Sequence, residues 1–301
     1  MELIEKAKAK INLAIDVTGV RADGYHQVDM VMGALALHDS VRMRPSSHID
    51  ATDVLEIEGS GLGVGLLRKE LFENNLIIRA YNCFANSMPE RNKIGNYRFK
   101  LNKSIPVAAG LGGGSSDAAA VLRALRRQHG GCSLENLMQM AASLGSDIPF
   151  FIEGGIVRAT GRGEILEHLA VDFETEIILI KPDFSLSTGK VYQNLNLKVV
   201  DQHPDIDLLI AGLARGDRSA IAAGAVNVLE IPAFALQPEL IQIKESMRES
   251  GAWLAMMSGS GPTIFGFFAA DNVKYAQELL QMRYPSYDVI RTKFDFTRET
   301  M

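Results

Sequence analysis

The chain has 301 residues, enough for about two domains, and its 47% hydrophobic and 22% charged residues are typical of a globular protein. Its 31 lysines and arginines against 36 acidic residues give a net charge of −5 with no basic block, which argues against a protein that binds nucleic acid or a membrane surface. An anionic ligand would have to be held by local geometry, for which the 27 glycines offer a means.

The first hundred residues predict mainly strands. Most residues from Leu3 to Val17 alternate with the period of a strand that has one buried face. The apolar residues at odd positions are Leu3, Ala7, Ala9, Ile11, Leu13, Ile15 and Val17, and the polar residues at even positions are Lys6, Lys8, Lys10, Asn12 and Asp16. Residues 45–69 are rich in Gly, Ser and Asp, so we expect an irregular loop there. The other elements expected in this part are a strand-like stretch at 28–41, a short strand at 54–57, a helix at 75–87 and a strand at 97–101.

A glycine-rich loop follows. Residues 110–114 hold four glycines and lead through Ser115, Ser116 and Asp117 into an amphipathic helix. Glycines let backbone N–H groups approach a ligand, and a helix N-terminus carries about half a positive charge. The loop therefore predicts a site for a di- or triphosphate; the alternative is a plain glycine turn that starts a helix. The spacing matches neither a P-loop, nor GxGxxG, nor the GxSxG nucleophile elbow.

The second half predicts a mixture of helices and strands. Residues 250–270 contain no ionisable group and are long enough to span a bilayer, but the Ser-Gly-Ser-Gly-Pro run at 258–262 would break such a helix. We expect two short strands around a tight loop instead. The other expected elements are a helix from Ser133 to Gly145, a short strand at 148–152, a glycine-rich turn at 161–163, a strand at 177–180 and a helix near 272–282.

The cellular setting is inferred from two features. Cys83 and Cys132 are too few for a disulfide framework or a CxxC zinc site, which favours a reducing compartment. The N-terminus carries charges where an export signal needs an apolar stretch. We expect a soluble, cytoplasmic protein.

Three motifs in one order resemble the GHMP kinases, a family of small-molecule kinases. They are Ala9-Lys10-Ile11-Asn12-Leu13, the glycine-rich loop, and the segment from Met257 to Thr263. The segments at 21–26 and 144–150 resemble the branch of this family whose substrate is an alcohol carrying a cytidine diphosphate group. The resemblance implies an α+β fold of two domains, with a ribosomal protein S5 domain 2-like domain at 1–160 and a ferredoxin-like domain at 161–301.

The resemblance also implies site residues. Asp147 matches the family's catalytic carboxylate, although an aspartate at a helix end would explain it structurally. Lys10 matches the catalytic lysine, although three lysines alternate on this strand. Implied for the ATP phosphates are Pro106, Ala109, Gly110, Leu111, Gly112, Gly113, Gly114, Ser115, Ser116 and Asp117. Implied for the adenine are Asn75, Leu76, Ile77 and Lys103, and for the cytidyl substrate Asn12, Tyr25, His26 and Tyr192.

Some expectations remain open at this point. ATP implies Mg²⁺, and the only candidate protein ligands for this ion in the sequence are Ser115 and Asp117. Lys8 stands where the family usually has proline, which should relax the start of the strand. The alternatives are a kinase of another alcohol, such as mevalonate or homoserine, and a catalytically silent ligand-binding regulator. No nucleic acid or membrane partner is expected, and the oligomeric state is not determined.

Overall fold

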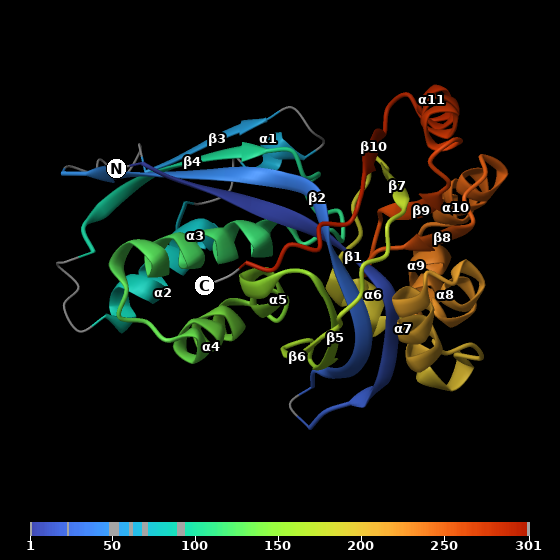
Figure 1. The fold of residues 1–301 in the computed structure, drawn as a ribbon, viewed down its shortest axis with the longest axis horizontal. Coiled ribbons are helices and arrows are strands. Elements are labelled where there is room, and N and C mark those ends of the chain that lie inside the picture. The colour runs from blue at the N-terminus through green and yellow to red at the C-terminus, as the bar shows by residue number, and fades with distance from the viewer. Residues whose placement is uncertain are drawn as a thin grey trace.

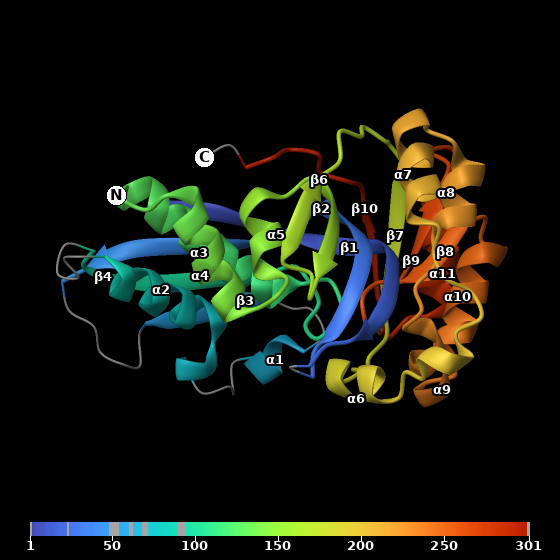
Figure 2. The same ribbon diagram turned by 90° about the horizontal axis from the view of Figure 1, so that it is seen from below.

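The computed structural model describes residues 2–22, 24–47, 54–59, 63–67, 72–88 and 94–299. Part of the loop expected at 45–69 lies outside these ranges. The described chain forms two β-sheets, and helices pack on a face of each (Figure 1). A pair of long strands, β1 and β2, runs from the first sheet toward the second (Figures 1 and 2).

The first sheet contains six strands in the described part, in the order β3-β4-β2-β5-β6, with β1 also paired to β2. The β3–β4 pair is parallel and the other pairs are antiparallel. The bounds of the strands are β1 Leu3–Val20, β2 His26–Ser46, β3 Leu55–Gly59, β4 Asn96–Lys103, β5 Ile156–Gly161 and β6 Ile165–His168.

One prediction about β1 is wrong in part. The strand alternates between buried and exposed residues only at its start, and from Ala7 to Ile15 every residue is buried. Lys8, Lys10 and Asn12 are therefore buried polar residues rather than members of a solvated face. An alternation of apolar and polar residues shows that a strand has two chemically different faces, but it does not show whether other parts of the chain cover the polar face.

Helices α2 to α5 pack along one face of the first sheet (Figure 1). Helix α3 begins at Gly113, so the second half of the glycine-rich loop forms its first turn. The segment expected as a strand at 148–152 is helix α5, because Pro149 stands in its first turn and Gly154 ends it. The bounds of the helices are α1 Val64–Leu67, α2 Leu76–Ser87, α3 Gly113–His129, α4 Leu134–Leu144 and α5 Ile148–Glu153, with a 3₁₀ turn at Phe72–Asn74.

The second sheet is antiparallel, in the order β10-β7-β9-β8. This order, with helices between β7 and β8 and between β9 and β10, is the ferredoxin-like arrangement that the resemblance implied. Strands β8 and β9 confirm the two strands expected around a tight loop. The bounds are β7 Glu176–Lys181, α6 Thr188–Gln193, α7 Ile206–Arg215, α8 Arg218–Gly224, α9 Glu230–Leu236, α10 Glu239–Glu249, β8 Leu254–Met257, β9 Ile264–Phe268, α11 Val273–Arg283 and β10 Asp288–Thr292, with a 3₁₀ turn at Leu197–Val199.

The two domains share buried structure. Ile11 and Leu13 of β1 belong to the same apolar cluster as Phe265 and Phe267 of β9. Strand β6 lies beyond the boundary expected at residue 160 and still pairs with β5 of the first sheet. We propose that the domain boundary lies in the connection from β6 to β7.

Neither cysteine forms a disulfide: Cys83 and Cys132 are both free thiols. Across the described ranges, the helices are too short or too polar to cross a membrane.

Candidate active site

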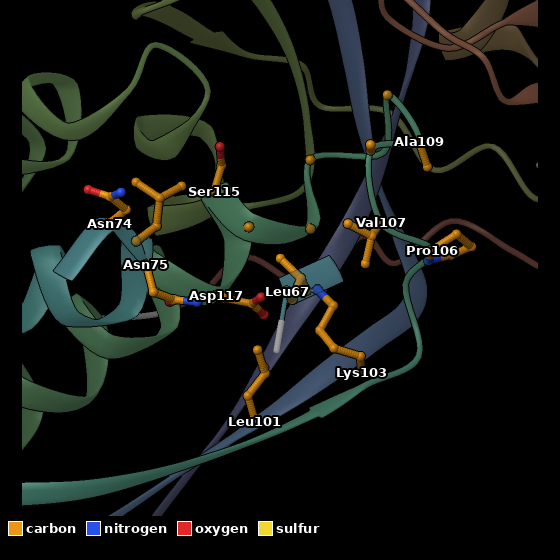
Figure 3. A pocket seen from close by; sticks show the side chains of 16 residues that line it. Leu67, Asn74, Asn75, Leu101, Lys103, Pro106, Val107, Ala109, Ser115 and Asp117 are labelled. Atoms are coloured by element: carbon orange, nitrogen blue, oxygen red, sulfur yellow. Dashed lines mark hydrogen bonds and ion pairs between the residues drawn. The ribbon is translucent and has the colours of Figure 1, made fainter. Parts of the chain in front are cut away.

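The first cavity lies between the glycine-rich loop, the end of β4 and the start of α2, and has a volume of about 340 Å³ (Figure 3). Asn75 caps α2, and its Oδ1 accepts a hydrogen bond from the Ile77 N–H. Of the residues expected around ATP, those lining this cavity are Asn75, Leu76, Lys103, Pro106, Ala109, Gly110, Gly112, Gly113, Gly114, Ser115 and Asp117.

Three of the residues expected around ATP line neither this cavity nor the second one, which lies between the two domains. Ile77, Leu111 and Ser116 are buried, with Ile77 in the core below α2. The Leu111 carbonyl instead accepts a hydrogen bond from the Lys10 N–H at 3.0 Å. These residues support the cavity walls without reaching the space that a ligand would fill.

The N-terminus of α3 opens onto the first cavity. Its N-cap, Gly112, is left-handed at φ +72° and has no side chain that could cap the helix. The first helical hydrogen bond runs from Ser116 N–H to Gly112 carbonyl. The preceding N–H groups therefore have no partner within the helix, and together with the helix dipole they form a place for an anion.

A buried charge cluster forms one wall of this cavity. The Lys103 ammonium donates to Asp39 and, at 3.1 Å, to Asp117 Oδ2, and Figure 3 shows Lys103 and Asp117 pointing toward each other. Asp39 also accepts the backbone N–H groups of Ser104 and Ile105. Burial raises the pKa of Asp117 to about 8, against the opposing effect of Lys103. The two carboxylates raise the pKa of Lys103 despite its burial.

A second cavity, of about 330 Å³, lies between the two domains. Lys10, Asn12, Asp147 and Tyr192 all line it, although they come from β1, the start of α5 and α6. Gly110, Gly112 and Ser115 line both cavities. A group bound at the glycine-rich loop would therefore face a ligand in the second cavity.

Lys10 is a buried residue in the wall of the second cavity. Its Nζ donates to Asn12 Oδ1 at 2.5 Å, and the residue is only 4% exposed. Burial lowers the pKa of Lys10, and the nearby Asp147 carboxylate partly offsets this effect. The ammonium is thus poorly hydrated, so an anion entering the cavity would be strongly attracted to it.

The third motif packs directly on the glycine-rich loop. Ser258 Oγ donates to the Gly110 carbonyl at 3.0 Å, and the Thr263 N–H donates to the Ala109 carbonyl at 3.3 Å. Gly110 has φ +76°, and a Cβ there would lie 2.4 Å from the Ser258 carbonyl oxygen. Only glycine fits this contact without displacing one of the two loops.

The aromatic residues expected around a cytidine lie in or next to the wall of the second cavity. The rings of His26 and Tyr192 are in contact, with centroids 4.7 Å apart. Tyr25 is 57% exposed, and the guanidinium of Arg162 lies 5.1 Å from its ring centroid. Tyr192 lines the cavity, whereas Tyr25 and His26 lie beside it.

Several residues in or next to the second cavity were not among the expected site residues. Arg162 lies in the glycine-rich turn after β5, where its only sequence signal was the turn itself. Thr188 and Ser260 line the cavity from the second domain, and their hydroxyl oxygens are 2.8 Å apart. Asn227 donates to the carbonyls of Met257 and Gly259 at 2.8 Å each, and so fixes the third motif. No pattern near Asn227 in the sequence points to this role.

Comparison with known proteins agrees with this geometry. A family model for the N-terminal domain of GHMP kinases matches residues 75–155, and one for their C-terminal domain matches residues 209–278. A 4-diphosphocytidyl-2-C-methyl-D-erythritol kinase of Pelotomaculum thermopropionicum is 40% identical over 89% of this chain and 90% of its own. The kinase of the same name from Bacillus cytotoxicus is 40% identical over 90% of both chains.

Solved structures show the same relationship. A crystal structure of 4-(cytidine 5'-diphospho)-2C-methyl-D-erythritol kinase superposes with a TM-score of 0.79 at 30% identity, covering 97% of this chain and 99% of that one. A homoserine kinase from Cytophaga hutchinsonii shares the fold, with a TM-score of 0.72 at 17% identity over 99% and 96% of the two chains. The α+β fold of two domains is confirmed, and the chain belongs to the GHMP kinase family of small-molecule kinases.

Proposed function

We propose that this kinase transfers the γ-phosphoryl group of ATP to the 2-hydroxyl of 4-diphosphocytidyl-2-C-methyl-D-erythritol, a step toward isoprenoid precursors in the non-mevalonate route. The observation that carries the proposal is the pair of cavities joined at Gly110, Gly112 and Ser115. The relatives at 40% identity carry the name of this kinase, which supports the choice of substrate. The free cysteines fit a cytoplasmic location.

The nucleotide belongs in the first cavity. Asn75 and Leu76, with Lys103 opposite, line the end that would take the adenine. The uncapped N-terminus of α3 would hold the phosphates through backbone N–H groups and the helix dipole. This arrangement binds a polyanion with no need for a positive overall charge, which agrees with a chain of net charge −5.

The substrate belongs in the second cavity. His26 and Tyr192 would contact the cytosine by stacking and hydrogen bonding, with Tyr25 and Arg162 at the rim. Asn12 would contact the substrate near the reacting hydroxyl, since it is hydrogen-bonded to Lys10. The binding energy of the cytidyl end then positions the alcohol for transfer.

Lys10 and Asp147 would carry the chemistry. The hydroxyl oxygen forms a bond to the γ-phosphorus, the bond from this phosphorus to the ADP oxygen breaks, and the Asp147 carboxylate accepts the hydroxyl proton. The Lys10 ammonium stabilises the negative charge on the transferred group. Its effect is large because the residue is buried, where charges are weakly screened.

A magnesium ion is expected with ATP, and the donors present fit one that keeps mainly water and phosphate ligands. Within the described ranges, no three His, Cys, Asp or Glu side chains gather as a metal site. Ser115 lines both cavities, and the buried Asp117 Oδ1 has no hydrogen-bond partner among the described residues. Ser115 and the ionised form of Asp117 would hold the ion, which neutralises phosphate charge when bound.

The test is an assay of ADP release with three alcohols: 4-diphosphocytidyl-2-C-methyl-D-erythritol, mevalonate and homoserine. We expect kcat/KM for the cytidyl substrate to exceed the other two by at least about 10³, since the cytidyl end supplies most of the contacts. Equal activity with mevalonate or homoserine would reject the substrate. An absence of ADP release with all three would instead support a ligand-binding regulator.

A further inference from the structure

The last described residues form a segment that returns from the second domain to the first. We call residues 293–299 the C-terminal strap; it leaves β10 and crosses the first domain toward α5 (Figure 1, red). The Ala36 N–H donates to the Lys293 carbonyl, and the Asp295 N–H donates to the Ala34 carbonyl, both at 2.9 Å. Strand β2 pairs with β5 through residues 28–33 and with β4 through residues 40–46. The strap therefore pairs with β2 in the gap between β5 and β4.

Lys8 fastens the strap to β1. Its Nζ lies 3.2 Å from Asp295 Oδ2 and 3.1 Å from Glu299 Oε1, and it donates to the Thr297 carbonyl at 3.2 Å. The Lys8 side chain is only 9% exposed, so its ammonium is largely desolvated and contacts the strap instead of water. The strap residues supply the charges and the carbonyl that make its burial tolerable. The expectation that position 8 merely relaxes the start of β1 is wrong, because Lys8 lies well inside the strand.

The contact with Lys8 lies at an irregular point of β1. Lys8 pairs with His38, but Lys10 pairs with Ala34, so the register shifts between the two lysines. At this shift the Lys10 N–H turns to the Leu111 carbonyl of the glycine-rich loop. The position of Lys10 thus depends on a local distortion of β1 rather than on a regular strand pair.

The other end of the strap holds α5. The Glu299 N–H donates to the Glu153 carbonyl at 2.9 Å, and the backbones of Arg298 and Gly154 form an isolated antiparallel β-bridge. Glu153 is the last residue of α5, and Asp147 is the N-cap of the same helix. One short segment therefore contacts both the distorted part of β1 that carries Lys10 and the helix that begins at Asp147.

We propose that Lys8 is a positioning residue: through its ion pairs with Asp295 and Glu299 it anchors the C-terminal strap and so sets Lys10 relative to Asp147. The proposal rests on the catalytic roles proposed above for these two residues. Lys8 lines neither of the cavities proposed for the two ligands. Its effect is on the geometry of the site, and a displacement of about 1 Å between reacting groups is enough to lower a rate by about 100-fold.

The test compares Lys8→Met, Lys8→Arg and the double variant Asp295→Asn, Glu299→Gln. The control is Lys100→Met, which removes a lysine that is paired with Glu58 on the same sheet and lines neither cavity. For Lys8→Met we expect kcat to fall by about 10- to 100-fold while KM for both substrates changes by less than about threefold. Lys8→Arg should restore most of kcat, and Lys100→Met should leave it unchanged.

Coupling between the partners gives a second criterion. Combining Lys8→Met with the double variant should lower kcat no further than Lys8→Met alone, because both changes break the same contact. Unchanged kcat in a Lys8→Met protein that is folded by circular dichroism overturns the proposal. So does an additive effect of the two changes, or a Lys100→Met protein that loses as much activity as Lys8→Met.

Amide hydrogen exchange tests the positioning without relying on turnover. Lys8→Met should accelerate exchange in residues 8–12 and 147–153 by at least about tenfold relative to β9, whereas Lys100→Met should not. Uniform acceleration throughout the chain would mean that Lys8 serves stability alone. If the wild-type protein phosphorylates none of the alcohols, the proposed function fails, but this exchange result still decides whether Lys8 and the strap fix these two segments. Should Lys8→Met fail to fold, the double variant is measured in its place.

Discussion

The contact between the glycine-rich loop and the third motif can be tested by Gly110→Ala. The new Cβ would lie 2.4 Å from the Ser258 carbonyl oxygen and 3.0 Å from that of Gly261, and neither backbone atom can rotate away. The left-handed φ of +76° adds a cost of about 1–2 kcal/mol for a residue with a Cβ. Forcing an extra methyl group into a packed site costs about 1–3 kcal/mol more. We therefore expect the free energy of unfolding to fall by about 2–5 kcal/mol.

Gly114→Ala is the matched control in the same loop. Gly114 lies within α3, and a Cβ there would meet Leu76 Cδ1 at an ordinary 3.6 Å. Because alanine is favoured over glycine inside a helix by about 1 kcal/mol, this variant should be as stable as the wild type or slightly more stable. Urea unfolding of the three proteins measures the difference. If Gly110→Ala lies within about 0.5 kcal/mol of Gly114→Ala, the packing argument is wrong.

Three further predictions concern the two cavities. Asp147→Asn should lower kcat by about 10²–10⁴-fold. The Kd for ATP should stay within twofold, because Asp147 lines the second cavity and not the first. An ADP-release assay measures kcat and calorimetric titration measures the Kd, and retained turnover would contradict the role of Asp147 as proton acceptor. His26→Ala should raise KM for the cytidyl substrate by about 5- to 150-fold with little change in KM for ATP, since stacking on a base is worth about 1–3 kcal/mol. Steady-state kinetics with each substrate varied in turn tests this, and a rise in KM for ATP alone would contradict it. Burial raises the pKa of Asp117 to about 8 in the folded protein, so the stability that its protonated form contributes is complete below about pH 4 and is lost as pH rises through 8. In urea unfolding, the wild-type protein should therefore lose more stability between pH 5 and pH 9 than Asp117→Asn does, and equal losses would refute this.

The glycine-rich loop and the elements near it could be predicted from local sequence. Four glycines before Ser-Ser-Asp and an amphipathic run indicate a helix start that binds an anion, because these constraints act on neighbouring residues. The start of α3 at Gly113, rather than after the loop, is a shift of a few residues within this prediction. The strand predicted at 148–152 is a helix, and the prediction is wrong because this segment is apolar throughout. Such a short run has no period that distinguishes a strand from a buried helix.

The cavity that unites Lys10, Asp147 and Tyr192 could not be derived from periodicity. The motif resemblance indicates these three residues. Lys10 is more than a hundred residues away from Asp147 and Tyr192 in the sequence, so only the fold brings them to one cavity. Arg162 and Asn227 carried no sequence signal of their own, because their partners come from other parts of the chain. The same holds for Lys8: its local sequence predicts a solvated strand face, but the C-terminal strap covers it.

The family and most of the secondary structure follow from local sequence, which also predicts that the glycine-rich loop binds an anion. A net charge of −5 excluded broad electrostatic capture of an anion but left room for a site built from backbone N–H groups. The tertiary structure is needed to see which polar residues are buried, how the loops at 110–114 and 258–262 fit together, and that the C-terminal strap contacts both Lys8 of β1 and Glu153 of α5. The physical reason is that helix starts and turns depend on neighbours in the chain, whereas burial and electrostatic strength depend on what packs against a residue from elsewhere in the fold.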